Sequence, residues 1–155
     1  MANAYFTFNG HLLGSTSLSA RQRELVVMRV AAVRCCEAEW TQHFFIARDA
    51  GLSDDEISRI ASGSDSPMWS AVDGALLCAT DELLTNGKIG ETTWQALCKE
   101  LNNQQLLDLI FTVGGYDTLA KLFESLQIEI EEDAVELISR YKGTIDSAAK
   151  RETQR

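Results

Sequence analysis

The segment RQRELVVMRVAAVR, residues 21–34, constrains the fold of this chain more than any other. At about 100° per residue, its apolar side chains cover most of the circumference of a helix. A helix that is apolar nearly all round must be buried, either in a large core or between subunits. Because a chain of 155 residues offers few such places, the segment predicts a homo-oligomer formed through a buried helix pair.

The rest of the chain also carries helical signals. It contains one proline, and no stretch alternates apolar and polar residues as a half-buried strand does. Ser19, Ser53 and Asn102 each stand three residues before a Gln or Glu, which is the pattern of a capping box at the start of a helix. We therefore predict an all-α fold of about six to seven helices. The expected helices span about 19–34, 36–50, 53–62, 66–86, 91–101, 102–126 and 133–142.

The sequence predicts one helical domain with short flanking segments. Residues 1–17 form an irregular N-terminal lead-in, residues 18–142 form the domain, and residues 143–155 form a polar, frayed tail. Pro67 is expected at the first position of its helix. Gly115, with its neighbour Gly114, marks a close approach of helices or a kink.

Four side chains in the later helices are expected in the core. Trp69 and Trp94 stand in apolar helical patterns as large anchors. Cys78 and Cys98 stand in similar patterns as small buried residues.

Charge and cysteine content limit the classes of function. The net charge is −9 at pH 7, and a field of that sign repels nucleic-acid phosphates. No run of about 20 apolar residues predicts a membrane span, and the N-terminus lacks the pattern of a secretory signal. We expect a cytoplasmic protein with reduced thiols, a small-molecule substrate, and neither nucleic acid nor membrane as a partner.

The predicted helix of 36–50 carries ionisable groups on its apolar face. Cys36, Glu39, Trp40 and His43 fall within about 90° of one another on that face. Glu39 and His43 stand four residues apart, so their side chains can touch. Burial of both groups is costly unless they pair, and a Glu–His couple can transfer protons near neutral pH. The alternative is a satisfied hydrogen bond in a core.

The preceding helix adds Glu24 and several arginines. Glu24 is flanked by apolar residues, where desolvation raises a carboxyl pKa and suits proton transfer; the alternative is a structural ion pair with an arginine. Arg23 and Arg34 share one side of the helix and could bind a substrate carboxylate, or else form ion pairs. His11 joins the site if the N-terminal segment covers it. With two histidines and no paired CxxC spacing, the sequence predicts no metal site.

Three stretches resemble the carboxymuconolactone decarboxylase/AhpD-like superfamily. They are LSARQRELVVMRVAAVRCCEAEWTQHFFIARDAGLSDDEI, WSAVDGALLCATDELLTNGKIGETTWQAL and LLDLIFTVGGYDTLAKL, and the resemblance covers roughly residues 5–128. It implies an all-helical fold and assembly of identical chains into a ring, so the homo-oligomer is expected to be a dimer, trimer or hexamer.

The resemblance also bears on the reaction. The peroxidase branch uses Glu-x11-Cys-x2-Cys-x3-His, which here reads Glu24, Cys36, Glu39 and His43. Glu39 replaces the second cysteine and removes the dithiol of a peroxide cycle, but a Glu–His relay remains. The decarboxylase branch needs neither a dithiol nor an organic cofactor, so the resemblance implies acid–base chemistry without a cofactor.

The leading hypothesis is a cofactor-independent lyase that decarboxylates a small cyclic carboxylic acid or lactone, or performs a related proton transfer. His43 would be the general acid/base, oriented by Glu39, and Glu24 would be a second acid/base. Trp40 would wall the pocket, and Arg23 or Arg34 would bind the substrate carboxylate.

Two other functions stay open. The first is a thiol-dependent alkylhydroperoxidase or disulfide reductase, which predicts a low pKa for the Cys36 thiol beside His43. The second is an oligomeric binding protein without catalytic activity.

Overall fold

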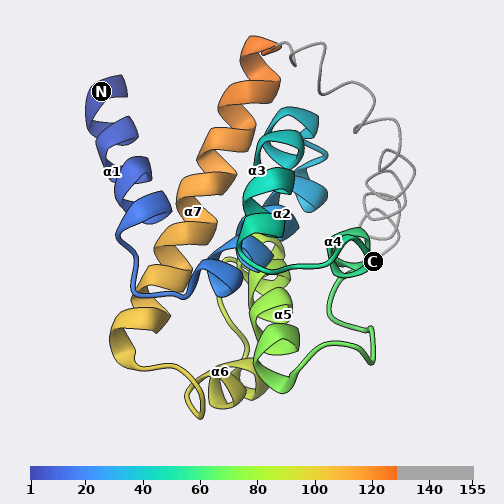
Figure 1. Ribbon diagram of the computed structural model, residues 1–155. Helices are drawn as coiled ribbons and strands as arrows, with labels where there is room; N and C mark the ends of the chain where they lie inside the picture. Colours follow the sequence, from blue (N-terminus) through green and yellow to red (C-terminus); the bar gives the residue numbers. More distant parts are fainter. Residues whose placement is uncertain (129–155) are drawn as a thin grey trace.

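The computed structural model describes residues 1–128, which form seven helices and no strand (Figure 1). The fold is therefore all-α, as predicted. The expected helix at 133–142 and tail at 143–155 lie outside the described residues. The helices are α1 (Ala2–Gly14), α2 (Ala20–Arg34), α3 (Glu37–Asp49), α4 (Asp54–Ile60), α5 (Ala71–Asn86), α6 (Glu91–Leu97) and α7 (Asn103–Leu126).

Local hydrogen bonds set the starts of three helices where the sequence predicted them. Ser19, Ser53 and Asn102 each accept from the backbone N–H three residues later, and the Gln or Glu there bonds back to the N-cap backbone. These reciprocal bonds satisfy backbone donors that a helix leaves open at its first turn. The capping boxes of α2, α4 and α7 are confirmed.

Helix α5 begins later than the sequence indicated. Its N-cap is Ser70, whose side chain accepts from the Asp73 N–H. Pro67 therefore lies in the turn before the helix rather than at its first position, and the prediction was wrong by several residues. The Trp69 indole N–H donates to the Gly63 carbonyl at 3.0 Å, which holds that turn in place.

The N-terminal segment is a helix, not the irregular lead-in that was predicted. Tyr5, Phe8 and Leu12 recur at helical spacing; Leu12 is buried, and Tyr5 donates a hydrogen bond from its hydroxyl to the Gly115 carbonyl on α7. The sequence obscured this helix because no side chain caps its N-terminus and it contains Gly10, which lowers helix propensity. Contact with α7 compensates for these weak local signals.

Helix α2 runs through the centre of the molecule. It packs against α3, α5 and α7, and every residue from Glu24 to Val33 is buried. Two large core clusters use its opposite sides, one with Val26, Val27 and Val30 and the other with Leu25 and Met28. A single chain therefore buries α2 without a partner subunit. The homo-oligomer stays a prediction, but the burial of α2 no longer supports it.

Helix α6 lies at the periphery, which changes two expected core positions. Trp94 is 37% exposed and Cys98 is exposed, so neither is the core residue that was predicted. Trp69 and Cys78 are half-buried. The Cys78 sulfur lies 3.4 Å from the Thr93 hydroxyl.

The close helix approach predicted at the glycine pair occurs at one of the two residues. A Cβ added to Gly115 would lie 2.6 Å from Leu12 Cδ1 and 3.2 Å from the Phe8 ring, whereas a Cβ on Gly114 would meet nothing within 4 Å. Because Gly115 has no side chain, α1 packs directly against the backbone of α7 at this residue, which we call the seat of α1.

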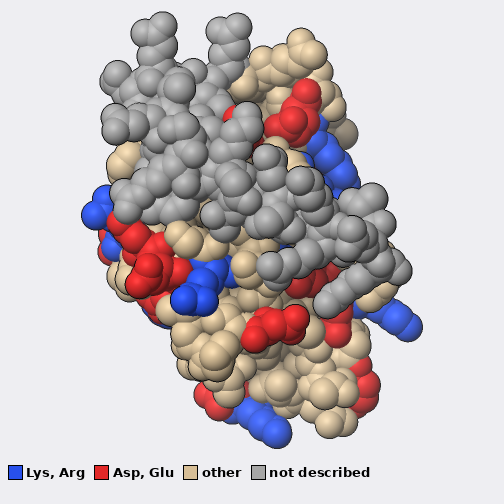
Figure 2. Space-filling model, turned by 90° about the vertical axis from the view of Figure 1, so that its right-hand side faces the viewer, with Lys and Arg blue, Asp and Glu red and all other residues tan. Residues whose placement is uncertain are grey.

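The described surface is mixed in charge. Figure 2 shows acidic and basic side chains interspersed on one face, without a continuous basic patch in the described part of that face. Within residues 1–128, no helix is both long and apolar enough to cross a membrane.

Candidate functional site

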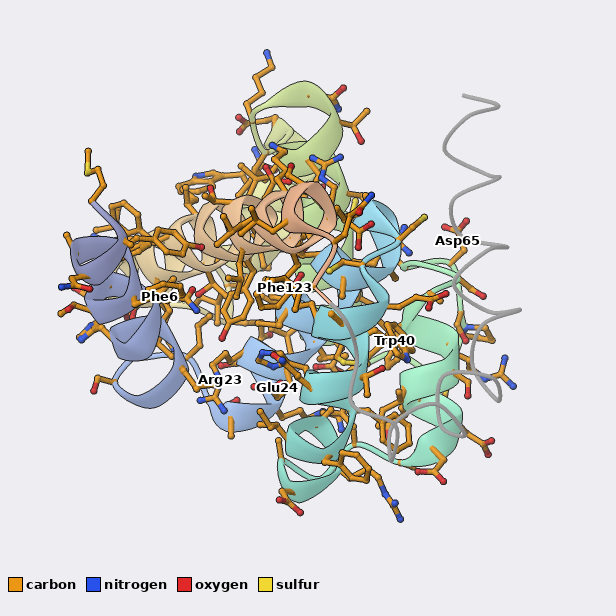
Figure 3. All side chains as sticks on the ribbon, turned by 90° about the horizontal axis from the view of Figure 1, so that it is seen from above. Phe6, Arg23, Glu24, Trp40, Asp65 and Phe123 are labelled. Atoms are coloured by element: carbon orange, nitrogen blue, oxygen red, sulfur yellow. The ribbon has the colours of Figure 1, made fainter. Side chains whose placement is uncertain are left out.

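A buried hydrogen bond between Glu24 and His43 joins α2 to α3. The Glu24 carboxylate is fully buried and lies with Oε2 2.7 Å from His43 Nδ1. Its other oxygen accepts from the Arg23 Nε–H at 2.8 Å. In the view of Figure 3, Arg23 and Glu24 lie between α1 and α3. Both carboxylate oxygens are thus occupied, and the bond at Nδ1 orients the imidazole.

The sequence suggested Glu39 as the partner of His43. The structure shows that the partner is Glu24. Spacing of four residues on α3 permits contact between Glu39 and His43, but the packing of α2 against α3 places Glu24 at the His43 ring. The role of orienting the imidazole therefore passes to Glu24. Arg23 forms the structural ion pair that was the alternative for Glu24.

Glu39 is the most unusual group of the site. Its side chain is fully buried, and neither carboxyl oxygen has a hydrogen-bond partner among the described residues. Burial, with a smaller effect of the negative charge on Asp117, raises the Glu39 pKa to about 9. The carboxyl is therefore neutral at pH 7 and can donate a proton.

Asp117 is held as an anion beside this acid. Its carboxylate accepts from Arg34 Nε at 2.5 Å and from Lys121 Nζ at 2.6 Å. Burial alone would raise the Asp117 pKa, but the bonds from Lys121 and Arg34 lower it. Arg34 is thus occupied by the ion pair that was its alternative.

Two tyrosines complete the surroundings, and the sequence analysis identified neither. The Tyr116 ring meets the His43 ring edge-on, with centroids 5.0 Å apart; burial and the nearby carboxylates raise the Tyr116 pKa. Burial raises the Tyr5 pKa to about 12, with further effects of Glu39 and Asp117. Tyr116 continues the buried stripe of α7, so its pattern in the sequence is that of an ordinary core residue.

The Cys36 thiol does not have the low pKa that a peroxidase requires. Cys36 is the N-cap residue of α3 and is fully buried. Burial raises its pKa to about 12, and the carboxylates of Glu39 and Glu124, where ionised, act in the same direction. The prediction of a low-pKa thiol was wrong because α7 covers this residue, with Ala120 and Phe123 packed against it.

The two remaining candidates are Trp40 and His11. Trp40 is fully buried in the core cluster that contains Leu25 and Met28, so it packs α3 against α2 instead of walling a pocket. His11 is exposed on α1, and its carbonyl accepts from the Ser15 N–H.

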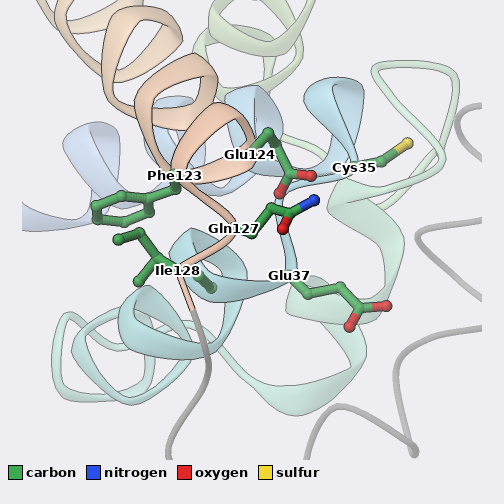
Figure 4. A pocket seen from close by; sticks show the side chains of 7 residues that line it. Cys35, Glu37, Phe123, Glu124, Gln127 and Ile128 are labelled. Carbon is green, nitrogen blue, oxygen red and sulfur yellow. The ribbon is translucent and has the colours of Figure 1, made fainter.

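A separate open hollow lies where the start of α3 meets the end of α7 (Figure 4). Its volume is about 510 Å³, and its lining residues are Cys35, Glu37, Ala38, Phe123, Glu124, Gln127 and Ile128. Neither Glu24 nor His43 lines it. Among the described residues, no group of three or more His, Cys, Asp or Glu side chains is arranged to hold a metal ion.

The arrangement combines two buried proton-active units. Glu39 is a neutral acid, and His43 is an imidazole whose Nδ1 is fixed by a carboxylate. Such a pair of differently tuned groups can donate a proton at one point and accept one at another.

Comparison with known proteins identifies the family and the fold of the chain. The sequence model of the carboxymuconolactone decarboxylase family matches residues 1–81. No curated protein sequence matches the chain. Among solved structures, a protein of unknown function from Agrobacterium tumefaciens, named as a candidate AhpD antioxidant defence protein, superimposes with a TM-score of 0.76 at 17% identity. The match covers 83% of this chain and 89% of that one.

Two further solved structures share the fold. A peroxidase-related protein from Silicibacter sp. TM1040 has a TM-score of 0.75 at 16% identity, over 85% of this chain and 71% of that one. A variant of the debrominase Bmp8 in complex with 2,3,4-tribromopyrrole has a TM-score of 0.73 at 10% identity, over 95% of this chain and 75% of that one. The AhpD-like fold that the sequence predicted is confirmed.

Proposed function

The chain belongs to the carboxymuconolactone decarboxylase family, and from that premise we propose that it is a cofactor-independent acid–base enzyme of the cytoplasm. Its substrate is a small cyclic carboxylic acid or lactone, and its reaction is decarboxylation or a related proton transfer. The observation that carries this proposal is Glu39, a fully buried carboxyl whose pKa is raised to about 9. A neutral acid near an imidazole–carboxylate pair is suited to protonate carbon.

The decarboxylation step follows from this acid. The carbon–carbon bond to the substrate carboxylate breaks, CO₂ leaves, and the electron pair moves into the conjugated ring as an enolate-like anion. The Glu39 carboxyl then gives its proton to carbon and becomes a carboxylate. Exclusion of water protects the carbanion from uncontrolled protonation.

His43 and Glu24 restore the proton. The imidazole, held through Nδ1 by Glu24 at 2.7 Å, passes a proton from solvent to the Glu39 carboxylate. In a substrate that only isomerises, the same imidazole removes the proton that Glu39 later returns elsewhere. Tyr116 keeps the His43 imidazole in place through its edge-on ring contact.

Arg23 is the cation closest to this pair and binds the substrate carboxylate. Its Nε–H is bonded to Glu24, while the guanidinium carries further N–H donors on its terminal nitrogens. Arg34 is committed to Asp117. A small ring is the ligand in the debrominase complex of the same fold, which supports a substrate of similar size here.

The thiol-dependent reaction has weaker support. The solved relatives include a peroxidase-related protein, but Cys36 has a raised pKa and Glu39 stands where the peroxidase spacing has its second cysteine. A binding protein without catalysis would not require a buried acid whose two oxygens both lack a hydrogen-bond partner within residues 1–128.

The proposal is tested by a panel of carboxylated lactones and cyclic acids, with CO₂ release as the measurement. We expect turnover by the wild type and a loss of about 100-fold or more in kcat for Glu39→Gln and His43→Gln, the range that general acid–base catalysis contributes. Asp49→Asn, at the exposed end of the same helix, is the control and keeps the wild-type rate.

Retained CO₂ release in Glu39→Gln would refute the assignment of the acid. Peroxide consumption that disappears in Cys36→Ser would instead support the thiol enzyme. A chain that turns over neither class of substrate, and binds them equally well after His43→Gln, would be a binding protein.

A further inference from the structure

The site is closed in this structure. Glu24 and Glu39 are fully buried, His43 is 5% exposed and Tyr116 is 1% exposed. A substrate with a ring and a carboxylate cannot reach these groups unless part of the protein moves. The helix with the fewest buried contacts can move with the smallest loss of packing energy.

Helix α1 lies against the site. The Tyr5 hydroxyl bonds the Gly115 carbonyl, and the next residue on α7, Tyr116, is the one whose ring contacts His43. The Glu39 carboxylate, when ionised, also raises the pKa of the Tyr5 phenol, so Tyr5 lies near Glu39. In Figure 3, Arg23 lies on the side of Glu24 that faces α1. Helix α1 thus forms one wall of the site.

Among the helices around the site, α1 is the least anchored. Leu12 is its one buried residue, whereas α2, α3 and α7 each contribute at least seven buried residues. Its main packing partner is α7, and Phe6 and Leu13 are largely exposed. Few buried contacts mean a low free energy of local opening.

The connection after α1 is fixed independently of the helix. Asp108 on α7 accepts from the Thr16 hydroxyl at 3.0 Å and from the N–H and hydroxyl of Ser17 at 2.6 and 2.7 Å. The chain is therefore held just after Ser15, the C-cap residue of α1. This anchor therefore lies between α1 and the start of α2 at Ala20.

We propose that α1 is a hinged cover over the acid–base site, seated on Gly115 and latched by the Tyr5 hydroxyl, and that its opening admits the substrate. The cover deepens the proposed function because it concerns access to the same residues, but it rests on packing and does not depend on which reaction occurs. Covers of this kind exclude water during a reaction and are drawn from the least stable elements of a fold.

The neighbouring glycines supply a matched pair of variants. Gly115→Ala places a methyl group 2.6 Å from Leu12 Cδ1 and 3.2 Å from the Phe8 ring, so the side chain of Leu12, the one buried residue of α1, must shift. Gly114→Ala adds the same methyl group to the same helix where nothing lies within 4 Å. Neither glycine is part of the acid–base machinery. The pair therefore distinguishes the effect of disturbing the α1–α7 contact from the effect of adding a methyl group to α7.

The test measures access to His43 without a substrate. Diethyl pyrocarbonate acylates neutral imidazole, and the chain has two histidines: buried His43 and exposed His11, which serves as the internal standard. Peptide mass spectrometry gives both rates. We expect Gly115→Ala to accelerate modification of His43 about tenfold or more relative to His11. This is the effect of lowering the free energy of local opening by about RT ln 10.

Gly114→Ala should match the wild type. Equal His43 rates in all three proteins, with native circular dichroism, would overturn the proposal, as would a wild-type His43 that reacts as fast as His11. If Gly115→Ala fails to fold, Tyr5→Phe removes the latch alone and should still accelerate His43; an unchanged rate there would also overturn it. Loss of CO₂ release in every assay would refute the proposed reaction and leave this result untouched.

Discussion

At the scale of single residues, Glu39 sets a pH dependence of stability. Its carboxyl has a pKa of about 9 when folded against an ordinary value of 4.5, so between these values the folded chain binds more protons than the unfolded chain. The free energy of unfolding therefore falls as pH rises through this window, by at most about 1.4 kcal/mol per pH unit. We expect Glu39→Gln to raise Tm relative to wild type by an amount that grows from pH 5 to pH 9.

Thermal unfolding followed by circular dichroism at several pH values checks this prediction. The two proteins share every other titrating group, so the difference between their Tm values isolates Glu39. Asp49→Asn, at the exposed end of α3, serves as the control and should follow the wild-type curve. Parallel curves for wild type and Glu39→Gln would show that Glu39 is not buried as an uncharged acid.

At the scale of elements, α2 carries the core that holds the site together. Leu25 is fully buried in α2, one residue after Glu24. Leu25→Ala should lower the free energy of unfolding by about 2–5 kcal/mol, since it removes buried methyl groups and leaves a cavity. Urea denaturation measures the loss. Leu126→Ala, at the end of α7 where the side chain is 61% exposed, should change stability by about 0.5 kcal/mol or less.

Comparable losses in both variants would contradict the central position of α2. The comparison also separates this helix from α1. Because α1 is anchored by Leu12 and few other contacts, its opening belongs to the low-energy local motions, whereas displacement of α2 requires global unfolding.

At the scale of the whole molecule, an exposed apolar face bears on the predicted assembly. Helix α7 exposes Leu107, Ile110 and Phe111, and the Phe111 ring meets Phe8 of α1 edge-on at 6.0 Å between centroids. Contiguous exposed apolar surface is typical of protein–protein contacts. If the chain is a homo-oligomer as predicted, sedimentation equilibrium should give a multiple of 17.2 kDa, and Phe111→Glu should lower that mass.

Phe45→Glu is the control for this prediction. Phe45 lies on α3 and is as exposed as Phe111, at 54% against 53%, but it is outside the apolar face of α7. Its substitution should leave the mass unchanged. A mass of one chain for the wild type at all concentrations would refute the homo-oligomer.

The sequence determined the features that depend on residues close together in the chain. The capping boxes of Ser19, Ser53 and Asn102 close hydrogen bonds over three residues, so no distant contact is needed to start those helices. The all-α class follows from such local signals together with helical periodicity. Glu24, Glu39 and His43 were also found from the sequence, because ionisable residues stand out on apolar helix faces.

Only the tertiary structure decided how these groups pair and what covers them. His43 bonds Glu24 on another helix and leaves Glu39 without a partner among the described residues, because the crossing of α2 and α3 fixes distances that spacing along one helix cannot. The helical form of α1 and its position beside α7 rest on contacts such as the one between Tyr5 and Gly115, across 110 residues. Packing between distant segments sets such contacts, and local sequence patterns do not encode it.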